Sequence, residues 1–228
     1  MKKSIFVSVL VFSAALVLVG CKSNPNEPEG GGSAKGHKYV DLGLSVKWAT
    51  MNVGATTPEG YGDYFAWGET STKETYNWST YFDTNDGGNT FTKYNNEGGK
   101  TVLDPEDDAA HVNWGGSWRM PTLAEWQELI DNCTWTLTTQ NGINGYKVTS
   151  NKAGYTDRFI FLPAAGNRYD SDLYDVGFKG LYWSSSLYEY GSSNAWYLSF
   201  GLDGRFLDDY RYYYSNRFLG LSVRPVLP

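Results

Sequence analysis

Two stretches near the C-terminus, GLYWSSS at residues 180–186 and GLSVRPV at residues 220–226, decide the fold that we expect. Both are rich in apolar and small residues and are typical of buried strands. Between them lies DDYRYYYSN at residues 208–216, which does not alternate apolar and polar residues as a core strand does. Its four tyrosines in five positions cannot all face inward, because successive side chains of a strand point to opposite faces. The sequence therefore predicts fixed strands that carry an exposed aromatic segment.

Tyr, Ser, Asn, Asp and Arg on loops are typical of a binding surface, because tyrosine offers a large rigid contact area and the polar residues offer adaptable hydrogen bonds. The alternative is a tyrosine-rich hairpin packed on its own domain. The loop at residues 167–179 has the same polar and aromatic character. We predict these ligand-contact residues: Tyr188, Glu189, Tyr190, Asp203, Arg205, Asp208, Asp209, Tyr210, Arg211, Tyr212, Tyr213, Tyr214 and Asn216, joined by Arg168, Tyr169 and Asp170.

The composition limits the classes of partner. The 228 residues carry 19 basic and 25 acidic side chains, a net charge of −6 that becomes −8 once Lys2 and Lys3 are removed with a leader. Such a balance argues against a nucleic-acid partner, whose phosphates require a basic surface. Two cysteines cannot form a disulfide framework.

The N-terminus has the pattern of a processing signal. A short basic start precedes an apolar run at residues 5–19, which is too short to span a bilayer. Residues 18–21, Leu-Val-Gly-Cys, resemble a bacterial lipobox, so residues 1–20 are expected to be a lipoprotein signal peptide and Cys21 the lipid attachment site. A soluble signal peptide with a chance cysteine is the alternative. Residues 21–37 are predicted to be a flexible tether and residues 38–228 the ligand-binding domain.

The clearest helix signal follows Pro121. Thr122 and Glu125 form a capping box, and Leu123, Trp126, Leu129, Ile130 and Cys133 recur at helical spacing, which predicts one buried stripe. Cys133 has no basic neighbour in the sequence that would lower its pKa, so we expect an inert core thiol.

Shorter signals fill the rest of the chain. Strands are predicted within residues 38–49, at residues 146–149 and 158–162, and along the alternating run 196–202. Asn-Gly pairs at residues 141–142 and 144–145 and Asp-Gly at 203–204 predict turns. Residues 69–100 predict a long irregular excursion fixed by Trp78, Phe82, Phe91 and Tyr94.

Acidic residues gather at two places in this part of the chain. Residues 83–87 lack the spacing of a calcium loop and predict a turn. Residues 104–111 predict the first turn of a short helix, although their carboxylates leave structural calcium open; no cofactor is predicted.

The motif RMPTLAEW at residues 119–126 resembles an element of the formylglycine-generating-enzyme branch of the C-type-lectin-like fold. Residues 182–186, 195–196 and 220–226 are similar to the C-terminal signature of bacterial lipoproteins on that fold, some of which are diversified by retroelements. The resemblance covers roughly residues 38–228. It implies an α+β, C-type-lectin-like fold with short antiparallel sheets, one or two helices and much irregular loop.

This resemblance implies a binding protein. The enzymatic branch depends on copper-binding cysteines, which this chain lacks once Cys21 carries lipid and Cys133 is buried, so we expect no enzyme. The expected protein is a receptor or adhesin, lipid-anchored in the bacterial cell envelope, in the outer membrane and exposed at the surface. Its partner would be an external protein or glycan. The alternative function is a structural component of the envelope or of a surface fibre, with the aromatic face buried against a partner subunit.

Overall fold

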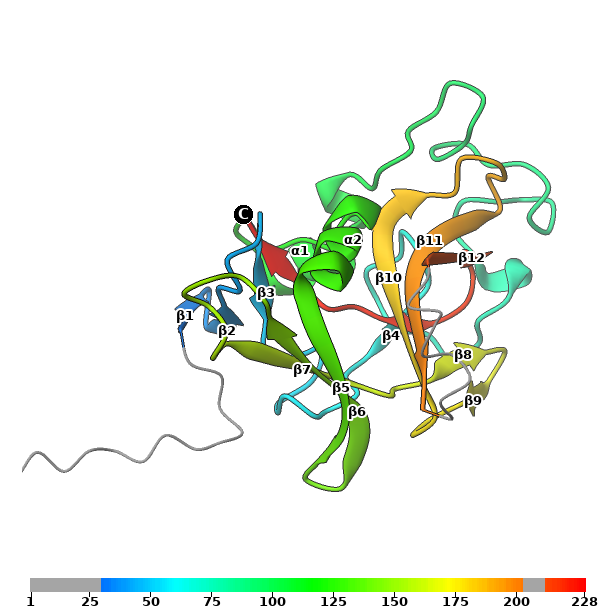
Figure 1. Ribbon diagram of the computed structural model, residues 1–228. Coiled ribbons are helices and arrows are strands. Elements are labelled where there is room, and N and C mark those ends of the chain that lie inside the picture. Colours follow the sequence, from blue (N-terminus) through cyan, green and yellow to red (C-terminus); the bar gives the residue numbers. More distant parts are fainter. Residues whose placement is uncertain (1–29, 203–211) are drawn as a thin grey trace, which may run out of the picture.

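A computed structural model describes residues 30–202 and 212–228, and for residues 212–214 it describes the backbone alone. Antiparallel sheets, two short α-helices and long irregular connections make up the described chain (Figure 1). This mixed α+β organisation confirms the coarse fold class expected from the sequence. The strands are β1 (Gly31–Ala34), β2 (His37–Val40), β3 (Lys47–Ala49), β4 (Tyr64–Phe65), β5 (Cys133–Gln140), β6 (Ile143–Ser150), β7 (Phe159–Pro163), β8 (Asn167–Tyr169), β9 (Asp172–Tyr174), β10 (Lys179–Leu187), β11 (Asn194–Gly201), β12 (Tyr212–Asn216), β13 (Leu221–Ser222) and β14 (Val226–Leu227). The α-helices are α1 (Ala109–Trp114) and α2 (Leu123–Asn132), and two 3-10 helices cover Trp78–Thr80 and Pro105–Asp107.

The strands form four sheets. Their orders are β1-β2-β3-β14, β12-β11-β10-β13-β4, β5-β6-β7 and β8-β9, and the β10–β13 pair is parallel whereas the other pairs are antiparallel. The two stretches predicted to be buried strands, residues 180–186 and 220–226, lie in the interior. Residues 180–185 are buried in β10, and residues 220–226 are buried as they pass from β13 to β14. The expectation of two buried segments is confirmed.

Helix α2 begins where the sequence predicts. The Thr122 side chain accepts from the Glu125 N–H at 3.3 Å, and the Glu125 carboxylate accepts from the Thr122 N–H at 2.8 Å. Arg119 donates to the same carboxylate at 2.7 Å, which fixes the entry into the helix. Trp126 is fully buried and donates through Nε1 to the Trp183 carbonyl at 3.2 Å, so α2 packs against β10.

A reciprocal pair of tryptophan hydrogen bonds closes the core behind β10. Trp67 Nε1 donates to the Ser184 carbonyl and Trp183 Nε1 donates to the Phe65 carbonyl, both at 2.8 Å. Both rings are fully buried. Because a buried indole N–H requires a partner, this exchange sets the position of the segment around β4 relative to the sheet.

Several local expectations were wrong. The Asn-Gly pair at 144–145 lies inside β6 instead of in a turn, because Asn141 and Gly142 already close the β5–β6 hairpin with φ of 48° and 83°. Strand β5 was not predicted. Phe82, which was expected to fix the excursion, is exposed, and the neighbouring Tyr81 is buried instead. The single short helix predicted after residue 104 is instead the 3-10 helix Pro105–Asp107 followed by α1. Asp108 caps α1 by accepting from the N–H groups of residues 110 and 111.

Regular structure begins inside the segment expected to be a tether. Strand β1 pairs with β2 through the register Ser33 with Lys38, and the Ala34 carbonyl accepts from Trp118 Nε1 at 3.0 Å. The ring of His37 stacks on Trp114 at 3.8 Å. Residues 30–37 therefore pack on the domain, whereas residues 1–29, which include the expected signal peptide and Cys21, lie outside the described residues.

Candidate functional site

Strand β12 contains the C-terminal part of the predicted tyrosine segment. It lies at the end of the five-stranded sheet and pairs with β11 through the register Leu198 with Tyr212, Tyr197 with Tyr213, Trp196 with Tyr214 and Asn194 with Asn216. Asn216 is exposed. The predicted contacts Asp203, Arg205, Asp208, Asp209, Tyr210 and Arg211 lie outside the described residues, as do the side chains of Tyr212, Tyr213 and Tyr214.

A buried arginine directly after β12 joins the sheet to the long excursion. Arg217 is fully buried and donates to the Asp83 carboxylate at 2.8 Å and to the Tyr81 hydroxyl at 2.8 Å. It also donates to the carbonyls of Tyr94 at 3.0 Å and Ser192 at 2.9 Å. One guanidinium therefore ties β12, the excursion and the β10–β11 turn together.

The aromatic rings around Arg217 complete this junction. Its guanidinium carbon lies 4.8 Å from the Trp67 ring centroid and 4.5 Å from that of Phe91. Asp83, in turn, accepts from the Thr92 hydroxyl at 2.7 Å. Burial alone would raise the pKa of Asp83, but the hydrogen bonds from Thr92 and Arg217 outweigh burial and lower it. The carboxylate is therefore a structural anion and not a free calcium ligand.

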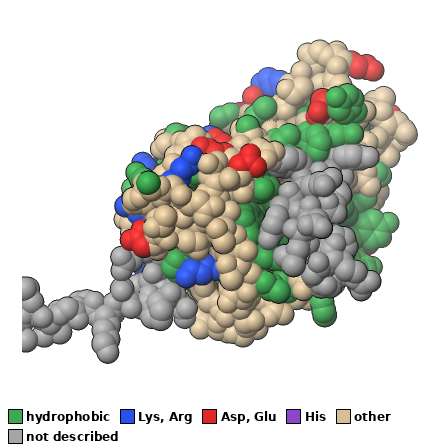
Figure 2. Space-filling view, viewed as in Figure 1, with side chains coloured by type: hydrophobic (Ala, Val, Ile, Leu, Met, Phe, Trp, Pro, Cys, Tyr) green, Lys and Arg blue, Asp and Glu red, His purple; other side chains and the backbone are tan. Residues whose placement is uncertain are grey.

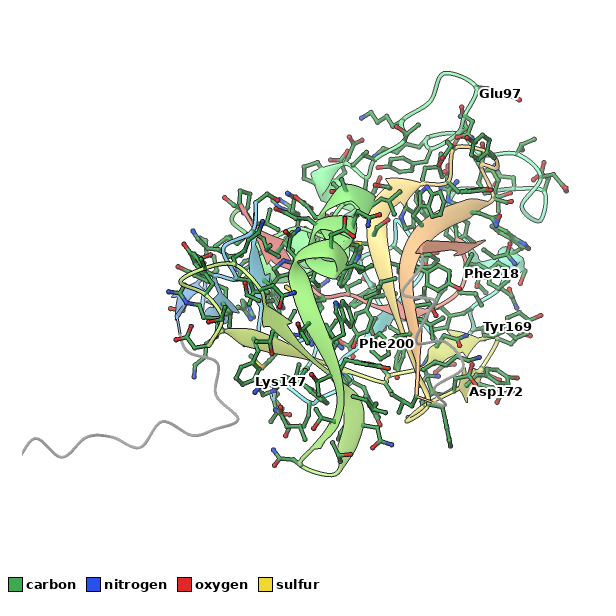
Figure 3. All side chains as sticks on the ribbon, in the orientation of Figure 1. Glu97, Lys147, Tyr169, Asp172, Phe200 and Phe218 are labelled. Atoms are coloured by element: carbon green, nitrogen blue, oxygen red, sulfur yellow. The ribbon has the colours of Figure 1, made fainter. Side chains whose placement is uncertain are left out.

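The β8–β9 hairpin lies beside the segment that follows β12. Arg168 and Gly220 exchange backbone hydrogen bonds at 2.8 and 3.0 Å, and the ring of Tyr169 lies 5.9 Å from that of Phe218. Figure 3 labels Phe218, Tyr169 and Asp172 along one side of the molecule. The predicted contacts at residues 168–170 therefore lie next to the segment that follows β12. Residues 167–179 were predicted to be a loop, whereas residues 167–174 form a hairpin.

Four apolar or aromatic side chains on and after this hairpin are exposed. Tyr169 is 45% exposed, Leu173 43%, Tyr174 47% and Phe178 70%. The rings of Tyr169 and Tyr174 lie 6.4 Å apart, and the Phe178 carbonyl accepts from the Leu202 N–H at 3.0 Å. Tyr169 and Tyr174 share one face of the hairpin with Asp172, whereas Leu173 pairs with Arg168 on the opposite face. We call Tyr169, Tyr174 and Phe178 the hairpin surface. It lies next to the point at which the chain enters residues 203–211.

Charged groups flank the hairpin surface. The Asp170 carboxylate accepts from Asn77 Nδ2 at 2.7 Å, and the Asp172 carboxylate beside the Tyr174 hydroxyl raises the pKa of that hydroxyl. Arg168 lines a hollow of about 580 Å³ together with Tyr64, Tyr76 and Lys73, and its guanidinium carbon lies 5.7 Å from the Tyr64 ring centroid. Among the residues that the structure describes, no carboxylate forms an ion pair with Arg168. Arg168 lies on the face of the hairpin opposite Tyr169 and Tyr174, so the face with the two tyrosines offers exposed rings and the Asp172 carboxylate.

The remaining predicted residues lie in the turn between β10 and β11. Tyr188 contacts Trp196 with 5.0 Å between ring centroids and Tyr190 with 5.6 Å, and Tyr190 is 81% exposed. The Glu189 carboxylate accepts from Trp196 Nε1 at 2.8 Å, so this predicted contact has a partner within the chain. Asn96 donates to the Tyr188 carbonyl at 3.1 Å, which ties the turn to the excursion.

The turn and the hairpin surface lie at opposite ends of β11. Eight residues of strand separate them, about 23 Å at ~3.3 Å per residue. Figure 1 places the turn, β12 and the hairpin along the same side of the molecule. In Figure 2, hydrophobic side chains are visible along that side. The described predicted residues thus share one side of the molecule but form two separate groups.

The carboxylates within residues 83–87, a stretch with some likeness to a calcium loop, accept hydrogen bonds from groups of the same chain. The Asp86 carboxylate accepts from the Thr90 hydroxyl at 2.7 Å and from the Thr84 hydroxyl at 2.9 Å. Hydrogen bonds from Thr90 lower the pKa of Asp86 to about 2. Among residues 30–202 and 212–228, no three His, Cys, Asp or Glu side chains gather in a way that could hold a metal ion.

Cys133 is buried at the junction of α2 and β5, and burial raises the pKa of its thiol to about 12. The thiol is therefore protonated at neutral pH and unsuited to nucleophilic attack. The sequence placed Cys133 on the helical stripe, whereas it is the first residue of β5. Its burial agrees with the expected inert thiol.

Tyr174 and Phe178 of the hairpin surface, and Leu173 on the opposite face of the hairpin, were not among the predicted contact residues. The polar and aromatic composition of residues 167–179 was recognised in the sequence, but the turn at Asp170 was not predicted. Asp170 has a φ of 47°, which allows the tight reversal between β8 and β9. That reversal brings Tyr169 and Tyr174 to one face of the hairpin.

Comparisons with protein-family models, with curated proteins and with solved structures found no match to this chain. Within the described part of the chain, none of the helices has the length and apolar character needed to cross a bilayer.

Proposed function

We propose that this chain is a ligand-binding lipoprotein of the bacterial cell surface with a C-type-lectin-like fold. In this proposal Cys21 carries the lipid in the outer membrane, and the aromatic side of the domain contacts an external protein or glycan. The observation that carries the proposal is the hairpin surface, in which the exposed aromatic side chains of Tyr169, Tyr174 and Phe178 lie on and just after the β8–β9 hairpin. Exposed aromatic clusters of this kind mark interaction sites on soluble domains.

The way the loops are supported favours recognition over packing. The buried Arg217 side chain bonds to the excursion and to the β10–β11 turn, whereas most of the surface of Tyr190 and Phe178 is exposed. Side chains at such positions can change without disturbing the core. This separation suits diversification by a retroelement, which we include in the proposal. A near-copy of the coding region for residues 182–226, differing at adenines and lying beside a reverse transcriptase gene, would support it.

The charges beside the hairpin surface define the class of ligand. Asp172, on the same face as Tyr169 and Tyr174, favours a cationic or hydrogen-bonding group. Tyr169 and Tyr174 would lie against a flat sugar face or an apolar side chain. A ligand with an apolar face and a cationic or hydrogen-bonding group fits this arrangement best.

The test is a glycan and protein-ligand array probed with the full chain in detergent micelles. We expect a hit whose affinity falls by about 2 kcal/mol in Tyr169→Ala or Tyr174→Ala, with melting unchanged. Val112→Ala, which truncates an apolar residue with 50% exposure on α1, is the matched control and should bind normally.

Three outcomes would refute the proposal. Binding that survives both tyrosine variants but fails in Val112→Ala would place the site elsewhere. Loss of folding in the tyrosine variants would show that their rings stabilise the domain. If the chain binds no array ligand but assembles through the hairpin surface, the envelope-component alternative replaces the receptor.

A further inference from the structure

A hollow of about 580 Å³ lies between the β8–β9 hairpin and the segment around Tyr76, and Arg168 lines it. Tyr76 and Asp170 exchange backbone hydrogen bonds at 2.9 and 3.0 Å, which hold the two segments together. Gly220 packs against both side chains, since a Cβ there would approach the Tyr76 ring to 2.7 Å and the Arg168 Cβ to 3.0 Å. The position of Arg168 in the hollow is therefore set by backbone pairing and close packing.

The Arg168 side chain uses few of its hydrogen-bond donors within the chain. It is partly buried and donates to the Ser171 carbonyl at 3.4 Å, which is long for a hydrogen bond. Its guanidinium carbon lies 5.7 Å from the Tyr64 ring centroid. Among residues 30–202 and 212–228, no carboxylate forms an ion pair with it. A guanidinium has five N–H donors in a planar fork that matches a carboxylate, so Arg168 is available to an anionic group of a ligand.

Two carboxylates line the same hollow. Asp63 and Glu74 are both exposed, and neither forms an ion pair within the described part of the chain. Burial raises the pKa of Tyr76, while the Arg168 guanidinium lowers it and the Asp63 carboxylate raises it further. A positive and a negative charge therefore act on one hydroxyl group without pairing with each other.

Lys73, a second cation that lines the hollow, is neutralised by the chain itself. Its Nζ lies 2.8 Å from the Glu69 carboxylate and donates to the Thr80 carbonyl at 3.1 Å. A ligand that is only anionic would bind Arg168 but would be repelled by the two unpaired carboxylates. A ligand that is only cationic would leave Arg168 without a partner. Charge complementarity therefore favours a ligand with one group of each sign.

We propose that this hollow binds a small zwitterion of the size of a dipeptide, whose carboxylate pairs with Arg168 and whose ammonium group faces Asp63 and Glu74. Two parallel N–H···O bonds from the guanidinium would hold the carboxylate. The hydroxyls of Thr72 and Ser171, which also line the hollow, can bond to the peptide group. The volume lies within the range of about 300–1,000 Å³ that is usual for small-ligand sites.

This site is separate from the hairpin surface. Arg168 lies on the face of the hairpin opposite Tyr169 and Tyr174, so the inference does not rest on the proposed function. Tyr169→Ala should leave dipeptide binding unchanged, and the two sites can therefore be tested independently.

Isothermal titration calorimetry of the full chain in detergent micelles tests the proposal with three probes. These are alanyl-alanine, its N-acetyl derivative, which lacks the ammonium charge, and its C-terminal amide, which lacks the carboxylate charge. We expect alanyl-alanine to bind, and each derivative to bind about tenfold more weakly, because each loses one charged hydrogen bond.

Substitutions in the hollow show which residues are responsible. Arg168→Met removes a guanidinium whose hydrogen bond to Ser171 is long, so melting should be unchanged while the affinity for alanyl-alanine falls about tenfold. Arg168→Lys keeps the charge without the planar fork and should recover only part of the affinity. Lys179→Met is the matched control, since its ammonium pairs with Asp175 at 2.8 Å outside the hollow, and this variant should bind as the parent does.

The acidic side of the hollow has its own test. A variant that combines Asp63→Asn with Glu74→Gln should bind alanyl-alanine and its N-acetyl derivative equally, because the ammonium group has lost its partners. The proposal would be overturned if alanyl-alanine did not bind, if the parent bound the N-acetyl derivative as tightly, or if Arg168→Met kept full affinity. An equal loss of affinity in Lys179→Met would also overturn it, since any surface cation would then have the same effect.

Discussion

Arg217→Met tests whether one buried guanidinium supports the loops of the candidate site. The substitution keeps a long apolar side chain but removes donors to the Asp83 carboxylate, the Tyr81 hydroxyl and the carbonyls of Tyr94 and Ser192. Asp83 stays buried and keeps its hydrogen bond from Thr92. Removing one partner of a buried ion pair costs about 3–5 kcal/mol. For a domain of this size the melting temperature should fall by about 6–20 °C.

Circular dichroism melts and limited proteolysis measure this effect. The excursion should become the first site of cleavage, because it loses its connection to β12 and to the β10–β11 turn. Arg158→Met is the control, since Arg158 is only partly buried and its Nη1 is 3.9 Å from the Asp41 carboxylate. That change should cost no more than about 1 kcal/mol. A loss of similar size in both variants would refute the special role of Arg217.

Three further predictions concern stability and reactivity. Thr122→Ala removes the N-cap of α2 and should destabilise the protein by about 1 kcal/mol, measured by urea denaturation; no change would exclude the capping box as a stabilising element. The folded pKa of Asp83 lies below its usual value of 3.8, so its contribution is complete above that value and is lost as the pH falls through the folded pKa. Melting temperature should therefore decrease below about pH 4, and Asp83→Asn should flatten that decrease. In a Cys21→Ser background, Cys133 should react with a thiol reagent at pH 8 only after denaturation, because burial raises its pKa to about 12; fast reaction of the native protein would contradict its burial.

Features determined by neighbouring residues could be predicted from the sequence. The capping box at Thr122 and Glu125 is a contact between residues three apart, and its helix begins as expected. The turn at Asn141 and Gly142 depends on the backbone freedom of those two residues, and it also forms. Local signals fail where tertiary packing decides. Gly145 resembles a turn residue, yet it lies in β6, where the strand requires a glycine because a Cβ would approach the Leu162 carbonyl oxygen to 2.3 Å.

Contacts between residues far apart in the chain were not predictable. Arg217 pairs with Asp83 across 134 positions, and Arg224 bonds to Asn52 across 172. Nothing in the sequence around either arginine distinguishes a buried side chain from an exposed one. Strand β5 was missed because CTWTLTTQ alternates apolar and polar residues over a short distance only.

The candidate site shows the same limits. The composition of residues 167–179 indicated a surface, but it did not indicate that a hairpin would bring Tyr169 and Tyr174 together. The sequence also grouped Tyr188 to Tyr190 with the segment after residue 203, whereas the length of β11 separates that turn from Leu202. Composition therefore predicted the character of the site, and the strand register determined its shape.

Oxidative footprinting of the full chain, alone and with the ligand found on the array, shows whether the hairpin surface contacts the ligand. We expect bound ligand to protect Tyr169, Tyr174 and Phe178 from modification, while Tyr155, which packs against Arg158 and lies outside the candidate site, is modified equally in both states. Protection of Tyr155 with continued modification of the hairpin surface would contradict recognition through these aromatic side chains.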